Sequence, residues 1–221
     1  MPEPRKPKAG LKAPRLPKPP GDLPLAELPD DEPADGATRA ELEYQGLDLT
    51  GRVIARPHFD TVIFAQLTAT GLQCDHLRAE DIRFTGCNLA NAMWPNVACH
   101  RAEFIGCRMT GFITLEAEFA DTVFRDCKLD LAQFYSATMR GVRFEDCPLT
   151  GGDFRMTDLT GAAFVRCDLS NADFTGATLA GVDLRSCQIE GMRVGPQELR
   201  GATINEAQAL ALVRAMGITI E

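Results

Sequence analysis

Large apolar residues recur at every fifth position along most of this chain. Between Leu49 and Ile204 this frame holds 32 positions, of which 27 are Leu, Ile, Val, Met, Phe or Trp. It also contains 11 of the 12 phenylalanines, whereas chance would place about a fifth of them there. A period of five fits neither the 3.6-residue turn of an α-helix nor the two-residue alternation of a strand. The frame therefore predicts a repeating structure of another geometry.

Five positions of the frame carry small residues, and each has a larger apolar partner two residues earlier. The pairs are Leu67 with Ala69, Leu72 with Cys74, Leu77 with Ala79, Val97 with Cys99, and Phe112 with Thr114. Such an exchange of volume is expected where both columns point into one narrow interior, because cavities in a core are destabilising. We predict that both columns form the core.

A longer period, four times the shorter one, is superimposed on it. Its members are Cys87, Cys107, Cys127, Cys147, Cys167 and Cys187. The spacing predicts a solenoid whose coil contains four five-residue units. Elsewhere the same column holds alanines, so we interpret the cysteines as small buried residues. A ladder of thiols for metal or redox chemistry is the alternative, but the chain has no CxxC pair or interleaved histidine.

Residues 162–184, with the sequence AAFVRCDLSNADFTGATLAGVDL, resemble the pentapeptide-repeat family, whose unit is roughly Ala-Asp/Asn-Leu/Phe-x-x. The resemblance implies an all-β fold, a right-handed quadrilateral β-helix with one unit on each face. We expect about eight coils and, at about 4.8 Å per coil, a rod about 38 Å long. Glycine is frequent two residues after the central apolar residue, where it suits a tight corner at positive φ.

The remaining segments flank this repeat, which we place at residues 47–204. Residues 1–37 form a Pro-rich tail, basic at first and then acidic, and we expect it to be disordered. Such a tail could contact nucleic acid, acidic lipid or its own acidic neighbour, or act only as a linker. Residues 38–46 are expected to cap the first coil. Thr38 and Glu41 have the spacing of a capping box, which predicts a short helix within that cap.

A C-terminal helix and tail follow the repeat at residues 205–221. Asn205 is the predicted N-cap, the helix extends to about Met216, and Gly217 ends it. The helix is apolar nearly all round, so one side can seal the last coil while the other requires a partner. We expect a homodimer through this helix, with the interface at Leu210, Leu212, Val213 and Met216.

No catalytic, cofactor-binding or metal site is expected. His58, His76 and His100 share no spacing with acids or cysteines, and the chain has no phosphate-binding glycine loop, nucleophile elbow or zinc-type motif. It also has neither an apolar run long enough to span a membrane nor a secretory signal. We therefore expect a cytoplasmic protein that does not contact a membrane.

Two functions compete. The first is a scaffold for protein–protein interaction. The second is a DNA mimic that binds DNA gyrase or another type II topoisomerase and modulates quinolone sensitivity, because residues 205–218 resemble the dimerising helix and tail of the quinolone-resistance members. The candidate partner-binding acids are Asp153, Asp158, Asp168, Asp173 and Asp183. The rod itself is not expected to bind nucleic acid.

Charge gives the mimic modest support. Of the net −8, residues 1–43 contribute −2 with seven bases and nine acids, which leaves −6 for the body. Residues 150–204 mix seven acids with five arginines, and the frame admits no inserted topoisomerase-binding loop of the kind that some family members have. A continuous negative stripe would favour mimicry, and mixed charge would favour the scaffold.

Overall fold

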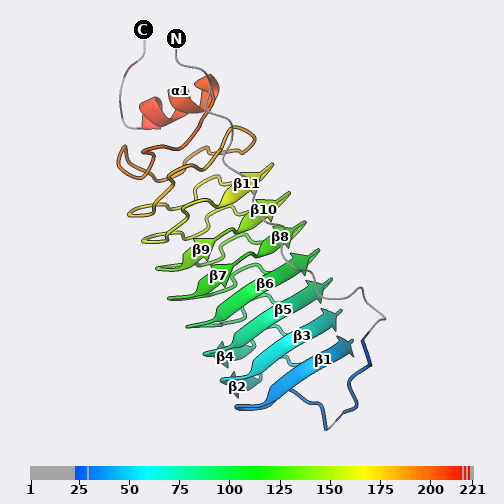
Figure 1. Ribbon diagram of the computed structural model, residues 1–221. Coiled ribbons are helices and arrows are strands. Elements are labelled where there is room, and N and C mark those ends of the chain that lie inside the picture. The colour runs from blue at the N-terminus through cyan, green and yellow to red at the C-terminus, as the bar shows by residue number, and fades with distance from the viewer. Residues whose placement is uncertain (1–22, 29, 216, 218, 220–221) are drawn as a thin grey trace.

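The computed structural model describes residues 23–28, 30–215, 217 and 219. Successive coils stack along one axis as a parallel ladder, and one helix lies across its C-terminal end (Figure 1). The fold is therefore a parallel β-solenoid with a C-terminal helix, as predicted. Its elements are β1 (Thr38–Gln45), β2 (Val53–Ala55), β3 (His58–Ala65), β4 (Gln73–Asp75), β5 (Arg78–Thr85), β6 (Ala98–Ile105), β7 (Glu118–Ala120), β8 (Val123–Arg125), β9 (Thr138–Arg140), β10 (Arg143–Glu145), β11 (Ala163–Val165) and α1 (Glu206–Ala215).

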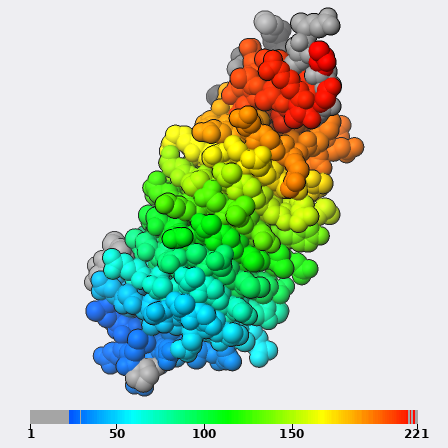
Figure 2. Space-filling model, turned by 180° about the vertical axis from the view of Figure 1, so that it is seen from behind, coloured from blue at the N-terminus to red at the C-terminus, as the bar shows by residue number. Residues whose placement is uncertain are grey.

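Every coil has the length of the cysteine period, because each strand pairs with the segment one such period further along the chain. β1 begins this register with Thr38↔His58, and the last pairing is Asp183↔Thr203. All pairings between these points keep the same offset, which confirms that the frame admits no inserted residue. The space-filling view shows the resulting elongated body, coloured in chain order from one end to the other (Figure 2).

Each coil meets the next at four positions, one in each five-residue unit, so the solenoid has four faces. Each face is defined by its paired residues, starting from the N-terminal end. Face 1 contains Asp48, Thr68 and Asn88, and face 2 contains Val53, Gln73 and Met93. Face 3 contains His58, Arg78 and Ala98, and face 4 contains Ile63, Arg83 and Glu103. These pairing residues precede the buried central residue and alternate with it, so we call them the outward positions. Four faces agree with the predicted quadrilateral cross-section, and its right-handed winding stays a prediction.

The number of turns differs from the expectation. The ladder β1-β3-β5-β6-β8-β10-β11 ascends by six steps, so the strand-bearing part has about six turns rather than eight. Beyond β11, isolated bridges such as Asp168↔Gln188 hold the coils together. The apolar frame continues through these last coils, where single pairings replace strands.

Two columns of aromatic rings fill the interior. Tyr44, Phe64, Phe84, Phe104, Phe124, Phe144 and Phe164 form the first, with neighbouring ring centroids 4.7–5.0 Å apart. Phe134, Phe154 and Phe174 stack in the second and meet the first edge to face. Ring spacing close to the rise of one coil lets dispersion and ring stacking act along the whole axis. Phe112 and Thr114 are both fully buried, which confirms the predicted exchange of volume.

The N-terminal cap differs from the prediction. The helix expected within residues 38–46 is wrong, because these residues form β1 and pair with β3. Tyr44 lies one coil before Phe64 and stacks on it, so burial in the ladder outweighs the local capping-box signal.

The expected disorder of residues 1–37 is also wrong for the described residues between 23 and 37. Pro33 is buried against the first core residues, and the Arg39 guanidinium donates hydrogen bonds to the carbonyls of Asp30, Asp31 and Glu32. This loop covers the open end of the first coil, as a solenoid end requires. Residues 1–22 lie outside the described residues.

The C-terminal helix begins as predicted. Asn205 Oδ1 accepts a hydrogen bond from the Gln208 N–H, and Gln208 Oε1 accepts one from the Asn205 N–H, both at 2.9 Å. This reciprocal pair is a capping box. After the last helical residue, Gly217 takes φ +78° and its N–H bonds to the Arg214 carbonyl, as expected of a glycine stop.

All eight cysteines are free and buried, which confirms that they are small core residues. The ladder thiols donate hydrogen bonds to carbonyls of the preceding coil, as Cys127 does to Phe104 at 3.2 Å. Away from this ladder, burial raises the pKa of the Cys99 thiol to about 12. Within the described part of the chain, no group of three or more His, Cys, Asp or Glu side chains could hold a metal ion.

Candidate interaction surfaces

The aspartates at outward positions hold the corners of the coils. In each, one carboxylate oxygen accepts a hydrogen bond of 2.9–3.0 Å from the backbone N–H two residues later. These Asx turns satisfy an N–H that the corner would otherwise leave without a partner. All five candidate partner-binding acids make this bond: Asp153, Asp158, Asp168, Asp173 and Asp183. Each therefore stabilises the fold, independently of any external contact.

The same five acids do not share one surface. Asp168 lies on face 1, Asp153 and Asp173 on face 2, Asp158 on face 3 and Asp183 on face 4. Only Asp153 and Asp173 are brought together, as a directly paired couple in adjacent coils. Two acids stack on one face only if a whole number of coils separates them. The other pairs among these five acids are not separated by a whole number of coils, so the acids are distributed around the rod.

Arginines neutralise three of these acids. The pairs are Asp153 with Arg155 at 2.6 Å, Asp173 with Arg193 at 2.9 Å and Asp183 with Arg185 at 2.7 Å. The hydrogen bond with Arg185 also lowers the pKa of Asp183. Charge on faces 2 and 4 is therefore mixed, and these acids do not make a continuous negative stripe.

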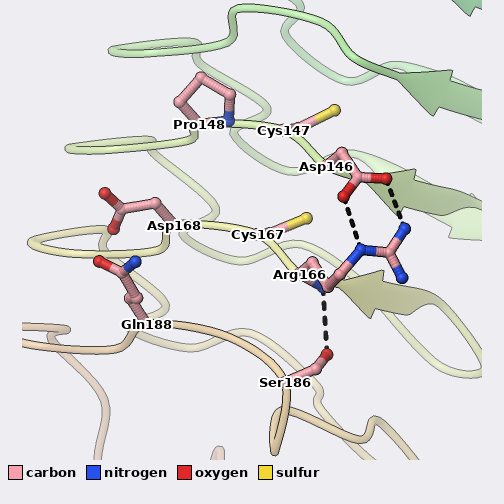
Figure 3. A pocket seen from close by; sticks show the side chains of 8 residues that line it. All are labelled: Asp146, Cys147, Pro148, Arg166, Cys167, Asp168, Ser186 and Gln188. Atoms are coloured by element: carbon pink, nitrogen blue, oxygen red, sulfur yellow. Dashed lines mark hydrogen bonds and ion pairs between the residues drawn. The ribbon is translucent and has the colours of Figure 1, made fainter.

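A hollow of about 410 Å³ lies where face 4 turns into face 1 near the C-terminal end (Figure 3). The Arg166 guanidinium donates to both carboxylate oxygens of Asp146, at 2.6 and 2.5 Å, and its backbone N–H donates to the Ser186 hydroxyl at 3.1 Å. The thiols of Cys147 and Cys167 bond to core carbonyls. These groups are engaged within the protein, so the hollow offers no nucleophile beside a base.

Face 3 brings two histidines together, which sequence reasoning missed. His58 and His100 line a hollow of about 170 Å³ with Arg78 and Glu80. The sequence signal that could have predicted this is that both histidines belong to the face-3 unit of their coils, two coils apart. His100 Nε2 lies 3.9 Å from a Glu118 carboxylate oxygen, too far for a hydrogen bond. The third histidine, His76, lies at another corner, in contact with Asp75.

Exposed apolar side chains gather on face 2 and its corners. Met93, Leu115 and Tyr135 are each about 40% exposed, and Leu131 and Met156 about 60%. They belong to four successive coils, together with the half-buried Ile113, which pairs with Met93. We call these six residues the face-2 patch. The Arg155 guanidinium lies 5.6 Å from the Tyr135 ring centroid and borders the patch with its ion pair to Asp153.

Two patch residues occupy corners that disfavour them. Leu131 and Met156 both have φ +59°, whereas the other 16 non-glycine residues at positive φ in the described chain are polar or charged. Polar side chains such as Asn tolerate this conformation best, and a large apolar residue there carries strain. Their side chains reach over the glycine corners of the next coil, Leu131 against Gly151 and Met156 against Gly176. Strain of this kind at an exposed site is a feature of functional surfaces.

The two sides of α1 differ. Leu212 and Gln208 are buried against the last coil, and Gln208 Nε2 donates to the carbonyls of Leu184 and Cys187, both at 2.8 Å. Leu210 is 46% exposed, and Val213 is half-buried. Of the predicted interface residues, Leu212 therefore seals the solenoid and Leu210 faces outward, while Met216 lies outside the described residues. No helix in the described chain is long and apolar enough to cross a membrane.

A family model described as "Pentapeptide repeat region" matches residues 77–154, 97–174 and 137–211, which together exceed half of the chain. Among solved structures, a trypsin-treated form of QnrB1, a plasmid-mediated fluoroquinolone resistance protein, is similar at 15% identity and a TM-score of 0.41, covering 83% of this chain and 98% of that one. HetL, involved in heterocyst differentiation regulation in the cyanobacterium Nostoc sp. strain PCC 7120, is similar at 15% identity and a TM-score of 0.34, covering 78% and 91%. A comparison with curated proteins gives no match.

Proposed function

Since the chain belongs to the pentapeptide-repeat family, we propose that it is a non-enzymatic scaffold that binds another protein through face 2. The face-2 patch is the observation that carries this proposal. Exposed apolar side chains that gather on one face and have a polar border are typical of protein-binding sites, and Tyr, Met and Arg are enriched in such sites. Family membership alone would not assign a function, because one fold can serve many.

The strained corners strengthen the proposal. Asn at Leu131 or Met156 would relieve backbone strain and remove exposed apolar surface, so folding alone gives no reason for Leu and Met there. A partner that buries both side chains would give such a reason, because their contact area then contributes to binding.

A direct test compares the wild type with the double variant Leu131→Asn and Met156→Asn. Both proteins are immobilised, exposed to native extract of the source cells, and the bound proteins are quantified by mass spectrometry. We expect at least one partner to be retained by the wild type and lost by the double variant. Val53→Asn is the matched control, because it removes an exposed apolar residue of the same face outside the patch. An identical bound set for wild type and double variant contradicts the proposal.

The DNA-mimic hypothesis is the alternative, and the surface supports it less. Its candidate acids lie on all four faces, and three of them are paired with arginine. A supercoiling assay with purified DNA gyrase separates the two functions. Inhibition at low salt that disappears at high salt, and that weakens in Asp153→Lys, would favour mimicry. Absence of inhibition and of protection from a quinolone leaves the scaffold.

A homodimer through α1 belongs to the same proposal. Leu210 and the neighbouring Ala211 are exposed, and a second copy of the helix could cover them by two-fold symmetry. Leu210→Glu should then give monomers in sedimentation at micromolar concentration, with an unchanged melting temperature. Leu212→Glu is a contrasting variant, because it should lower the melting temperature by unsealing the last coil. If the wild type is already monomeric at that concentration, α1 acts only as a cap.

A further inference from the structure

The face-2 patch presents apolar side chains in four successive coils. In chain order the coils contribute Met93; Ile113 and Leu115; Leu131 and Tyr135; and Met156. Successive coils are about 4.8 Å apart, so the three steps from the first coil to the fourth cover about 14 Å. A partner segment that lies along the rod and contacts every coil must therefore return a side chain to the same side about every 5 Å.

The spacing of the coils distinguishes the conformations that such a partner segment can have. An α-helix has a pitch of about 5.4 Å, so it falls out of step with the coils by about 0.6 Å at each step and about 2 Å over the patch. A strand returns a side chain to the same side about every 6.7 Å, and its mismatch over the patch is about 6 Å. A polyproline II segment does so only about every 9.3 Å and skips alternate coils. Of the three, the helix alone contacts all four coils.

The width of the patch and its backbone pairing also favour a helix. Leu131 and Tyr135 stand at the two corners on either side of Gln133, so the chain between them spans at most about 13 Å. One helix with its side chains is about 10–12 Å in diameter. The Ile113 N–H donates to the Ala92 carbonyl at 2.9 Å, because the backbone of this face is paired between coils. A partner therefore cannot join face 2 as an added strand and must bind through side chains.

The border of the patch on the face-1 side is basic. Arg108 and Lys128 pair directly in adjacent coils, and both are exposed. Within the described part of the chain, neither side chain has an ion-pair partner. Asp130 is the acid between Lys128 and the patch, so two bases against one acid leave this border positive. Acidic side chains of a partner would complement it.

The border on the face-3 side is acidic. Glu116 lies at the corner, Glu118 occupies the next outward position, and both are exposed. Glu116 has no ion-pair partner among the described residues, and the nearest charged group to Glu118 is His100 Nε2 at 3.9 Å. Arg155, also on this side, is neutralised by its ion pair with Asp153. Basic side chains of a partner would complement this border, so the two sides of the patch select opposite charges.

We propose that the partner segment at face 2 is an amphipathic α-helix of about three turns that lies along the rod. Its apolar side chains, at positions i, i+4 and i+7, cover the face-2 patch. Its acidic flank lies towards face 1 and its basic flank towards face 3. The apolar contacts supply most of the affinity, and the exposed charges fix the orientation of the helix. This inference rests on the proposed function of face 2, to which it adds the conformation and charge pattern of the partner.

Binding of synthetic peptides to the full-length protein, measured by fluorescence anisotropy, tests the conformation. The probe has about 14 residues, with Leu at helical spacing, Glu on one flank and Lys on the other. The control peptide has the same composition with Leu at every second position, the period of a strand. We expect the helical peptide to bind at least about tenfold more tightly than the control peptide. Leu131→Asn combined with Met156→Asn should weaken it about tenfold, and Val53→Asn should leave it unchanged.

Charge reversal tests the orientation. Arg108→Glu combined with Lys128→Glu should weaken binding of the helical peptide about fivefold. A peptide with Lys on both flanks should show the opposite order and bind this variant more tightly than the wild type. Arg200→Glu combined with Arg214→Glu is the matched control, because it makes the same change in net charge at exposed positions outside the patch. It should leave both affinities within about twofold of the wild type.

Three outcomes would overturn the inference. Equal affinity for the helical and control peptides would show that face 2 does not select a helix. Equal effects of the two charge reversals would show that the borders do not orient the partner. Self-association of the wild type that the double Asn variant abolishes would assign the patch to a second copy of the chain. Circular dichroism of each variant verifies that the solenoid is intact.

Failure of this inference is distinguishable from failure of the proposed function. If proteins of the cell extract are retained through Leu131 and Met156 but the helical peptide binds no better than its control, the scaffold stands and the helical partner is wrong. If retention from the extract does not depend on these two residues, the proposed function of face 2 is itself wrong.

Discussion

Faces 2 and 4 share one backbone geometry and present their outward residues in opposite environments. Val53 on face 2 is 68% exposed, whereas Ile63, in the next-but-one unit of the same coil, is fully buried. Each residue pairs with its counterpart one coil further along the chain, Val53 with Gln73 and Ile63 with Arg83. Burial of an outward residue therefore differs between faces that share the same backbone pairing.

The comparison shows how a regular solenoid acquires distinct surfaces. The core columns repeat on every face because each coil must fill the same interior volume. The outward positions have no such constraint, so they can hold a corner aspartate, an exposed apolar patch or buried side chains. The outward positions therefore distinguish one face of this protein from another.

Large-to-small substitutions in the core should be the most destabilising, and the loss of unfolding free energy should be similar beneath both faces. Phe144 lies in the column under face 4 and Phe134 in the column under face 2, and both are fully buried. Changing either to Ala should lower the free energy of unfolding by about 3–5 kcal/mol, measured by denaturant melts. A loss below about 1 kcal/mol for either would mean that its column is not core.

Substitutions at outward positions should change the free energy of unfolding by different amounts on the two faces. Ile63→Ala should lower the free energy of unfolding of the full chain by about 2–5 kcal/mol, because it removes a buried side chain. Val53→Ala should change it by no more than about 0.5 kcal/mol, because Val53 is exposed. Equal losses of unfolding free energy for the two variants in denaturant melts would contradict the expected difference between the faces.

Relieving the backbone strain at one corner of face 2 should increase stability by a small amount. Leu131→Asn should raise the free energy of unfolding by up to about 1 kcal/mol, because Asn tolerates positive φ better than Leu. Asn171→Leu, the reverse change at the same corner two coils later, should lower it by a similar amount. Thermal or denaturant melts measure both variants. A loss of stability in Leu131→Asn would show that Leu131 serves packing rather than binding.

The two faces should also differ in the pH dependence of stability, and this is the smallest of the expected effects. Burial raises the pKa of Asp173 on face 2, but hydrogen bonds from Thr175 outweigh it and the pKa is lowered overall. A lowered pKa means that the stabilisation is present above the unfolded value near 4 and is lost as pH falls through the folded value. Asp173→Asn should therefore reduce the loss of stability between pH 7 and pH 3.

The matched variant Asp183→Asn should reduce that loss less. The pKa of Asp183 on face 4 is also lowered, but its side chain is half exposed, so water screens the interaction. Denaturant melts at the two pH values measure both variants. A larger effect at Asp183 would reverse the expected order.

Much of the fold follows from the sequence because the repeat is a strong local signal. The five-residue frame predicts the core columns, since only residues that meet inside one narrow interior need a constant period and a constant summed volume. The spacing of the cysteines predicts the coil, since equivalent residues stack only if each coil has the same length. The ends of α1 are also predictable, because Asn205, Gln208 and Gly217 act through bonds to backbone groups within three residues.

Contacts between distant segments were decided only by the tertiary structure. The capping-box signal at Thr38 and Glu41 is overridden because Tyr44 gains more from stacking on Phe64 than a short helix could provide. The five aspartates look alike in sequence but lie on four faces, since their place around the rod depends on the coil. The exposure of Val53 and the burial of Ile63 also depend on tertiary contacts, which a residue's own neighbours along the chain do not specify.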